Sequence, residues 1–401
     1  MKLLLIHQNF PGQFRQLAPY LLKRGHDVVA IGSHSRPVSF EGRFIRYKEP
    51  SKLKDECPLG TQLWHEALQR AKIVAGICSN LEDDGWKPNC ILAHPGWGET
   101  LGIKEIWSDV PQILWPESWV LPEHGGYGLD PLKPKPGLEE RLEQLGRNIL
   151  TQQALQQAVS WVVPTQHQAN SFPAEFQGEK MHIIHEGIDT SLACPNLEVE
   201  YEVRGISISR NTPTITFVNR NLERLRGFDI FMHSLPLIQK NHPDVRVLIV
   251  GDNESGYGSG HPSGRILREV MIEELQGKID LERIHFLGRV PHQALITILQ
   301  ASWVHVYLSY PFVLGWSLLE AMACGCCIVG SKGMPVGEVI HDGVEGLLVS
   351  IHDSDNLANR VSALLNNAEL RQQFANQARR SALEWDEKNT LHKLAELVES
   401  F

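Results

Sequence analysis

The 401-residue sequence lacks a long apolar run that could cross a bilayer. Its most apolar stretch, residues 303–330, carries Glu320 as its one charged side chain, but a proline and two glycines divide it into short pieces. The apolar start, Met1 to Ile6, is too short for a signal peptide because polar residues follow directly. We therefore expect a cytoplasmic protein.

An excess of positive charge is also missing. The 38 Lys and Arg against 47 Asp and Glu give a net charge of -9, which argues against a general nucleic-acid binder, because such affinity rests on neutralising phosphates. Several catalytic signatures are absent too: Gly-x-Gly-x-x-Gly after the first strand, Gly-x-Ser-x-Gly, His-Glu-x-x-His and the Walker loop. These absences disfavour a dinucleotide dehydrogenase, a serine hydrolase, a zinc protease and a P-loop enzyme.

The seven cysteines indicate neither a disulfide framework nor a metal site. Their number is odd, and most lie in apolar contexts, as reduced core thiols do. Cys324, Cys326 and Cys327 crowd together without metal-ligand spacing. His182 and His185 are three residues apart, so on a strand they would face opposite sides. We expect no metal and no cofactor.

What is present is an alternation of short apolar strands with amphipathic helices, typical of doubly wound parallel α/β domains. A polar stretch at residues 195–213, expected to be irregular, separates two such halves. We predict an N-terminal domain over residues 1–200, a second domain over 201–380, and a helix over 381–401 that crosses back to the first. Ligands of this fold bind at the carboxyl ends of the strands, here in a cleft between the domains.

The most informative segment runs from Tyr310 to Gly325, a glycine-bearing loop followed by a short helix with one carboxylate. A helix start offers unpaired amides and a positive dipole end, and Gly315 lets a ligand approach the main chain. This geometry suits a nucleotide diphosphate, with Glu320 facing sugar hydroxyls. Arg220 at a strand end and Arg226 before a helix are candidate diphosphate ligands, although surface arginines are commonly only solvated.

Three loops of the first half are candidate ligand loops because each follows a strand. In the segment His7 to Phe14, Gly12 and Gln13 are expected near the transferred group. In the other two loops, residues 94–99 and 115–118, the side chains of His94, Glu99 and Glu117 could orient an acceptor hydroxyl, or simply stabilise their loops. The proline-rich segment 116–136, with Lys133 and Lys135, is either an ordinary surface loop or one that selects the acceptor or touches a membrane peripherally.

These segments resemble the retaining glycosyltransferases of family 4, whose GT-B fold has two facing Rossmann-like domains with an interdomain cleft. The resemblance covers nearly the whole chain and is carried by the loop at 7–14, His182-Ile-Ile-His-Glu-Gly-Ile-Asp189, Asn219 to Gly227, Phe286-Leu-Gly-Arg-Val290 and Leu319-Glu-Ala-Met-Ala. It implies that Arg220 and Arg226 hold the donor diphosphate and Glu320 the ribose. The expected donor site is completed by Gly12, Gln13, Gly251, Arg289, Val290, Leu314, Gly315, Trp316 and Ser317, and the expected catalytic set is Arg220, Arg226, Glu117 and His94.

The sequence departs from the family pattern at two positions. Phe312 stands where the first glutamate of the E-x7-E motif contacts the donor sugar, and Glu117 stands where many members have a histidine. The resemblance implies transfer of a hexose from a nucleotide diphosphate sugar, a UDP-sugar, to a hydroxyl acceptor in polysaccharide, exopolysaccharide or glycolipid synthesis. Phe312 motivates the alternative of a non-catalytic nucleotide-sugar-binding relative in a polysaccharide assembly. A GT-B epimerase or phosphorylase fits the segments less well.

Overall fold

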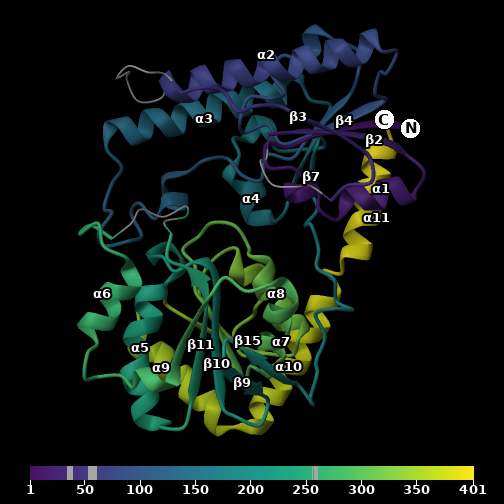
Figure 1. Ribbon diagram of the computed structural model, residues 1–401. Coiled ribbons are helices and arrows are strands. Elements are labelled where there is room, and N and C mark those ends of the chain that lie inside the picture. The colour runs from purple at the N-terminus through teal and green to yellow at the C-terminus, as the bar shows by residue number, and fades with distance from the viewer. Residues whose placement is uncertain (34–38, 53–60, 255, 257–260) are drawn as a thin grey trace. The chain divides into compact units, whose positions relative to one another are not determined.

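The computed structural model describes residues 1–33, 39–52, 61–254, 256 and 261–401. The chain forms two compact units, which Figure 1 shows as two sheets with their own helices. The first unit contains Met1–Pro122, Lys135–Gly187 and Glu387–Phe401, and the second contains Glu123–Pro134 and Ile188–Asp386.

The first unit is built on a parallel seven-stranded sheet in the order β3-β2-β1-β4-β5-β6-β7. Alternate residues of β1 point to opposite faces, as the pleat requires. Leu4 and Ile6 pack with α2 and α3, whereas Leu3 and Leu5 pack with α1 and α11, so the sheet is covered on both sides. The elements are β1 (Lys2–Ile6), α1 (Leu17–Lys23), β2 (Asp27–Gly32), β3 (Arg43–Arg46), α2 (Thr61–Asp83), β4 (Cys90–Ala93), β5 (Gln112–Leu114), α3 (Leu138–Gln157), β6 (Ser160–Val163), α4 (Gln166–Ser171), β7 (Met181–Ile183) and α11 (Glu387–Glu399).

The second unit repeats the plan with a parallel six-stranded sheet in the order β12-β11-β10-β13-β14-β15. Phe217 packs on the face covered by α5 and α9, and Val218 on the face covered by α7, α8 and α10 (Figure 1). The elements are β10 (Thr214–Asn221), α5 (Phe228–Asn241), β11 (Arg246–Asp252), α6 (Leu267–Glu274), β12 (Ile284–Gly288), α7 (His292–Ala301), β13 (Val304–Tyr307), α8 (Trp316–Ala323), β14 (Cys327–Ser331), β15 (Gly346–Val349), α9 (Ser354–Asn366) and α10 (Ala368–Leu383).

The stretch at 195–213 is not irregular, and that expectation is wrong. It contains an antiparallel hairpin of β8 (Glu200–Val203) and β9 (Ile206–Ser209). Arg204 and Gly205 have φ of 51° and 78°, the left-handed values that a tight two-residue hairpin needs. Both strands alternate polar and apolar residues, but each is only four residues long, and the turn is Arg-Gly rather than the Asn-Gly or Asp-Gly that marks a hairpin most strongly.

The two units differ from the predicted domains in three places. The first division falls at Gly187 and Ile188 rather than at residue 200, and the second at Asp386 and Glu387 rather than at residues 380 and 381. Glu123–Pro134 belongs to the second unit although it lies within the first half of the chain. The C-terminal helix α11 packs on α1 in the first unit, where Arg24 binds Glu399 through two hydrogen bonds of 2.8 and 2.7 Å. The first unit is therefore made from three separate stretches of sequence.

Candidate functional site

His7 and His94 lie side by side where the strand order of the first sheet reverses. His7 follows β1 and His94 follows β4, and their ring centres are 5.3 Å apart. Burial lowers the pKa of His7 to about 4; burial and then the neighbouring His7 lower the pKa of His94 to about 3. Both rings are neutral at pH 7. Gly12 has φ of +46°, and a Cβ there would lie 2.5 Å from the His7 ring.

Gln13 and Glu117, predicted from separate loops, are hydrogen-bonded to each other. The Gln13 side-chain amide donates to Glu117 Oε1 at 2.9 Å. Burial, followed by the charge of Glu186, raises the pKa of Glu117 to about 7, and the Gln13 hydrogen bond opposes the rise. Glu117 also has φ of 59°, a strained value for a glutamate. A half-buried carboxyl group that titrates near neutral pH can accept or donate a proton there.

Glu99 is fully buried, so the structure favours its loop-stabilising role over contact with a ligand. The Tyr47 hydroxyl donates to its Oε1 at 2.7 Å. Burial raises the pKa of Glu99 to about 7. Nearby, Arg70 binds both Glu49 and Glu66. Tyr47 and Arg70 were not singled out from the sequence, because nothing in their local segments marks them.

Arg220 lies near the carboxyl end of β10 and Arg226 follows that strand, at the corresponding position of the second sheet. Arg220 is exposed, and Arg226 is half-buried and donates to Ser309 Oγ, after β13, at 3.0 Å. Among the residues that the structure describes, neither guanidinium forms an ion pair with a carboxylate. Gly227 has φ of +64°, and a Cβ there would lie 2.5 Å from Leu308 Cβ, so only glycine lets the chain bring Arg226 this close to β13.

Phe312 lies between two cationic or ionisable side chains. The Arg226 guanidinium is 5.4 Å from the ring centre, and the ring of His124 is 5.7 Å away at an interplanar angle of 65°. His124 is buried and comes from Glu123–Pro134, the segment that the first half of the chain contributes to this unit. Sequence reasoning gave His124 no role at Phe312, since 188 positions separate the two residues.

The start of α8 differs in detail from the expectation. Gly315 precedes the helix, but its amide donates to the Tyr307 hydroxyl at 2.9 Å, and a Cβ at this glycine would lie 2.8 Å from that oxygen. Gly315 is therefore required for packing against Tyr307. Glu320 is buried, and its Oε1 is 2.6 Å from His292 Nε2. Leu314 is buried in the core, Ser317 is half-buried and Trp316 is exposed.

The remaining predicted donor residues lie after β11 and β12. Gly251 has φ of +155°, and a Cβ there would lie 2.8 Å from the Asn219 carbonyl oxygen. Arg289 binds Asp252 at 2.9 Å and Glu254 at 3.0 Å, so its side chain is already neutralised. Its carbonyl oxygen accepts from Arg204 at 3.2 Å, and Val290 packs on the core. The main chain at Arg289 is thus held by the β8–β9 turn.

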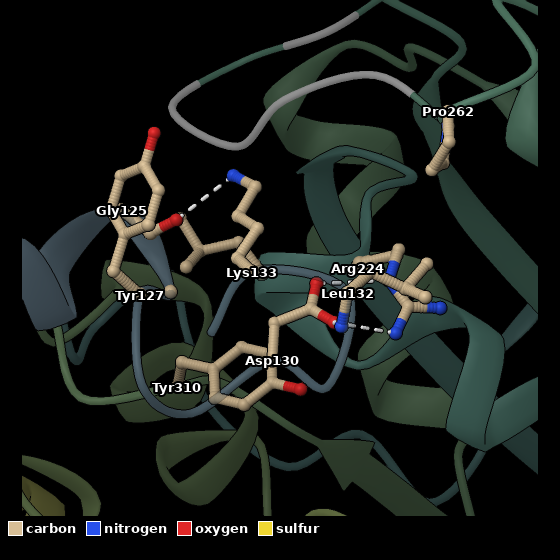
Figure 2. Close-up of a pocket in the computed structure, with 10 residues that line it drawn as sticks. Gly125, Tyr127, Asp130, Leu132, Lys133, Arg224, Pro262 and Tyr310 are labelled. Carbon is tan, nitrogen blue, oxygen red and sulfur yellow. Dashed lines mark hydrogen bonds and ion pairs between the residues drawn. The ribbon is translucent and has the colours of Figure 1, made fainter. Parts of the chain in front are cut away.

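A cavity of about 240 Å³ in the second unit is lined by Arg224 and by residues of the Glu123–Pro134 segment (Figure 2). Asp130 holds Arg224 through hydrogen bonds of 2.9 and 2.7 Å, and Lys133 Nζ donates to the Gly125 carbonyl oxygen at 2.9 Å. Burial lowers the pKa of Lys133. The residues that line the cavity are Gly125, Gly126, Tyr127, Asp130, Leu132, Lys133, Arg224, Leu225, Pro262 and Tyr310.

The described residues contain no group of His, Cys, Asp or Glu arranged to hold a metal ion. Their six cysteines are free thiols; Cys57 lies outside the described residues. None of the described helices combines the length and apolar character that a membrane crossing requires.

The two parallel sheets have the same strand order, apart from the additional edge strand β7 in the first. In each sheet, candidate ligand-binding residues lie where that order reverses. This architecture is that of an α/β protein of the GT-B class with Rossmann-like domains. Family models match both halves: residues 24–193 match the glycosyl transferase family 4 group, and residues 201–381 match glycosyl transferases group 1. The chain belongs to the family 4-like glycosyltransferases.

Curated relatives carry the name D-inositol 3-phosphate glycosyltransferase. The protein of Corynebacterium aurimucosum is 26% identical over 238 residues, which are 57% of this chain and 54% of the relative. That of Corynebacterium jeikeium is 26% identical over 397 residues, 95% of this chain and 90% of the relative. The alignments span 54% and 48% of the length of the first two curated relatives, about half.

Solved structures share the fold. Sucrose-phosphate synthase from Thermosynechococcus elongatus has a TM-score of 0.75 at 17% identity, covering 100% of this chain and 98% of that one. Anabaena HepE, solved in complex with UDP-glucose, has a TM-score of 0.69 at 18% identity and covers 100% of both chains. At such identities the likeness describes the architecture alone.

Proposed function

We propose that the protein is a retaining glycosyltransferase that moves a hexose from a UDP-sugar to a hydroxyl acceptor in polysaccharide, exopolysaccharide or glycolipid synthesis. The observation that carries this proposal is the pair Arg220 and Arg226, two guanidiniums at the carboxyl edge of the second sheet without described carboxylate partners. Guanidiniums bind phosphate oxygens through charge-assisted, often bidentate hydrogen bonds. The complex of HepE with UDP-glucose supports the choice of donor.

In this proposal the second unit holds the donor. Arg220 and Arg226 neutralise the diphosphate, whose charge increases as the glycosyl bond breaks. Glu320 accepts from the ribose hydroxyls, and His292 beside it fixes the orientation of the carboxylate. The main chain at Arg289 and Val290 contacts the base, and Gly251, Leu314, Trp316 and Ser317 complete the pocket. The arginines take the place of a metal ion, so transfer continues in the presence of EDTA.

The chemical step is substitution at the sugar C1, with the acceptor attacking on the same face from which the nucleoside diphosphate leaves. The bond between the sugar C1 and the phosphate oxygen breaks, the acceptor oxygen bonds to C1 on the same face, and the departing phosphate oxygen takes the acceptor proton. The anomeric configuration is retained. The protein supplies positioning and electrostatic stabilisation.

The first unit is proposed to hold the acceptor. Neutral His94 and the Glu117 carboxyl group, with Gln13 bound to it, present hydrogen-bonding groups to a hydroxyl. The name of the curated relatives makes an inositol phosphate a sensible member of the acceptor panel.

A thermal-shift screen of nucleotide sugars tests the donor, because a ligand that binds the folded state raises its melting temperature. The best donor is then incubated with an acceptor panel, and the product is analysed by NMR. A product with retained anomeric configuration supports the proposal, whereas an inverted product contradicts it. Donor epimerised at C2 would instead indicate a GT-B epimerase.

The second candidate is a non-catalytic relative that binds nucleotide sugars within a polysaccharide assembly. Phe312, packed against Arg226 and His124, is the observation that favours it, because an aromatic ring offers no carboxylate to the donor sugar. Calorimetry and donor hydrolysis separate the candidates. UDP-sugar binding without transfer or hydrolysis over a broad acceptor panel supports the second.

Peripheral membrane contact through the 116–136 segment is a further part of the proposal, motivated by Lys133 and Lys135. Cosedimentation with anionic liposomes tests it, with neutral liposomes as the control. Recovery of all the protein in the supernatant contradicts membrane contact and leaves the donor assignment intact.

A further inference from the structure

A second cavity, of about 200 Å³, lies at the opposite edge of the second sheet from Arg220 and Arg226. Arg210 lies before β10, Trp303 immediately precedes β13, and Cys327 begins β14. The strands are parallel, so their carboxyl ends lie about 15 Å away at roughly 3.3 Å per residue. The cavity is lined by Arg210, Trp303, Gly325, Cys327, Ala368, Arg371, Gln372 and Ala375.

Two guanidiniums, Arg210 and Arg371, line this cavity without a described carboxylate partner. Arg371 Nη1 donates to the Leu364 and Leu365 carbonyl oxygens at 2.6 and 2.8 Å. Arg210 Nη1 donates to the Gln300 carbonyl oxygen at 2.9 Å. Each guanidinium has five N–H donors, so each keeps several that no described acceptor uses.

Trp303 holds both arginines in place. Its indole N–H donates to the Arg210 carbonyl oxygen at 2.7 Å, and the Arg371 guanidinium stacks 4.3 Å from its ring centre. Burial, and to a lesser extent the positive charge of Arg210, lower the pKa of Arg371. The positive charges of Arg210 and Arg371 thus repel each other in a partly desolvated site, and an anion bound between them would reduce that repulsion.

We propose that this cavity binds a small phosphate-class oxyanion, making it an anion site separate from the donor site in the same unit. The planar forks of Arg210 and Arg371 match the tetrahedral oxygens of phosphate or a phosphate monoester. The cavity volume is below the roughly 300–1,000 Å³ of pockets for larger ligands, which excludes a nucleotide sugar here. The proposal does not depend on the proposed transfer activity.

Both arginines also have a structural role, since each binds carbonyl groups at a helix end. The start of α10, Ala368, adds the positive end of a helix dipole to the same cavity. Arg210→Gln keeps an N–H donor on a polar side chain but removes the positive charge and the guanidinium fork, so it is the main test variant. Arg371→Lys keeps the charge and removes the planar fork.

The experiment measures melting temperature against inorganic phosphate, and separately glycerol 3-phosphate, with ionic strength held constant by sodium chloride. At ten times the dissociation constant the wild type should gain about 3 °C. Arg210→Gln should lose that gain, and calorimetry should show at least tenfold weaker phosphate binding. Arg283→Gln, an exposed arginine of the same unit, should behave as the wild type. A response to glycerol 3-phosphate but not to phosphate assigns the site to monoesters.

Arg226→Gln distinguishes this site from the donor site, because it should keep the phosphate response. Circular dichroism without phosphate establishes that each variant is folded. A response to phosphate or glycerol 3-phosphate that is equal in the wild type and Arg210→Gln overturns the proposal. So does a wild type that responds to neither compound more strongly than to chloride. A response lost in Arg226→Gln but kept in Arg210→Gln places phosphate at the donor site and also overturns it.

Discussion

The Arg226 guanidinium carbon lies 5.4 Å from the centre of the Phe312 ring, and His124 contacts the same ring at 5.7 Å. Phe312 therefore orients a cation while giving it no negative charge. A glutamate at this place would neutralise Arg226 instead. The aromatic ring thus leaves the Arg226 guanidinium available to an anion.

Replacing Arg226 by Ala should lower kcat about 100-fold or more, because a preorganised donor to the departing diphosphate is lost. Arg226→Lys keeps the charge and should retain more activity than the alanine variant. Steady-state kinetics with the best UDP-sugar provide the measurement, and Arg283→Ala serves as a remote control in the same unit. An alanine variant with the wild-type rate would remove Arg226 from the proposed mechanism.

Phe312→Glu should weaken UDP binding about tenfold, since the new carboxylate competes with the diphosphate for Arg226, and tenfold corresponds to about 1.4 kcal/mol. Phe312→Leu adds no charge and should change the dissociation constant by no more than about fivefold, because a partly exposed cation–π contact contributes only about 0.5–1 kcal/mol. Isothermal titration with UDP distinguishes the two. Equal affinities in both variants would show that Arg226 does not bind the diphosphate.

Glu117→Gln should flatten the pH dependence of kcat/KM near pH 7, where the wild-type carboxyl group titrates. Gln13→Ala should move the same limb to higher pH, because the amide that stabilises the carboxylate is removed. Rates measured from pH 5.5 to 9 give both results. An unchanged limb in Glu117→Gln would assign the titration to another group.

Glu99→Gln should stabilise the protein at pH 8 by about 1–3 kcal/mol relative to the wild type. The pKa of Glu99 in the folded protein, about 7, is above the ordinary value near 4.3. Protonated Glu99 therefore contributes its full stabilisation below pH 4.3, and this contribution to the free energy of unfolding is lost as the pH rises through 7. The variant can still accept from Tyr47. Urea unfolding at pH 5 and pH 8 measures the difference, with exposed Glu105→Gln as control; a pH-independent difference would contradict the assignment.

Gly227→Ala should lower the free energy of unfolding by more than about 2 kcal/mol. The strain of a left-handed backbone at alanine adds to the steric overlap of its new Cβ with Leu308. Gly277→Ala is a matched control: its φ is +74°, but nothing lies within 4 Å of the new Cβ. Chemical denaturation of both variants separates strain from overlap. Similar losses in the two would show that the Leu308 contact is unimportant.

The order of strands and helices was predictable because apolar runs and amphipathic spacing are local properties. The predicted alternation of strands and helices is observed in both halves, and the segment from Tyr310 to Gly325 divides into loop and helix as expected. The β8–β9 hairpin was missed because its two alternating strands have only four residues each and its turn, Arg204-Gly205, is not one of the strong hairpin dipeptides. Arg204, at its turn, then proved to support the main chain at Arg289.

By itself the sequence determined the class of fold, the family and the residues after each strand, because these depend on periodicity and on motifs of adjacent residues. Only the tertiary structure decided which of those residues meet. Gln13 and Glu117 are 104 positions apart, His124 and Phe312 are 188 apart, and Arg210 and Arg371 are 161 apart. The pairing of such distant side chains is fixed by strand order and by packing of the whole chain, and no local pattern encodes it.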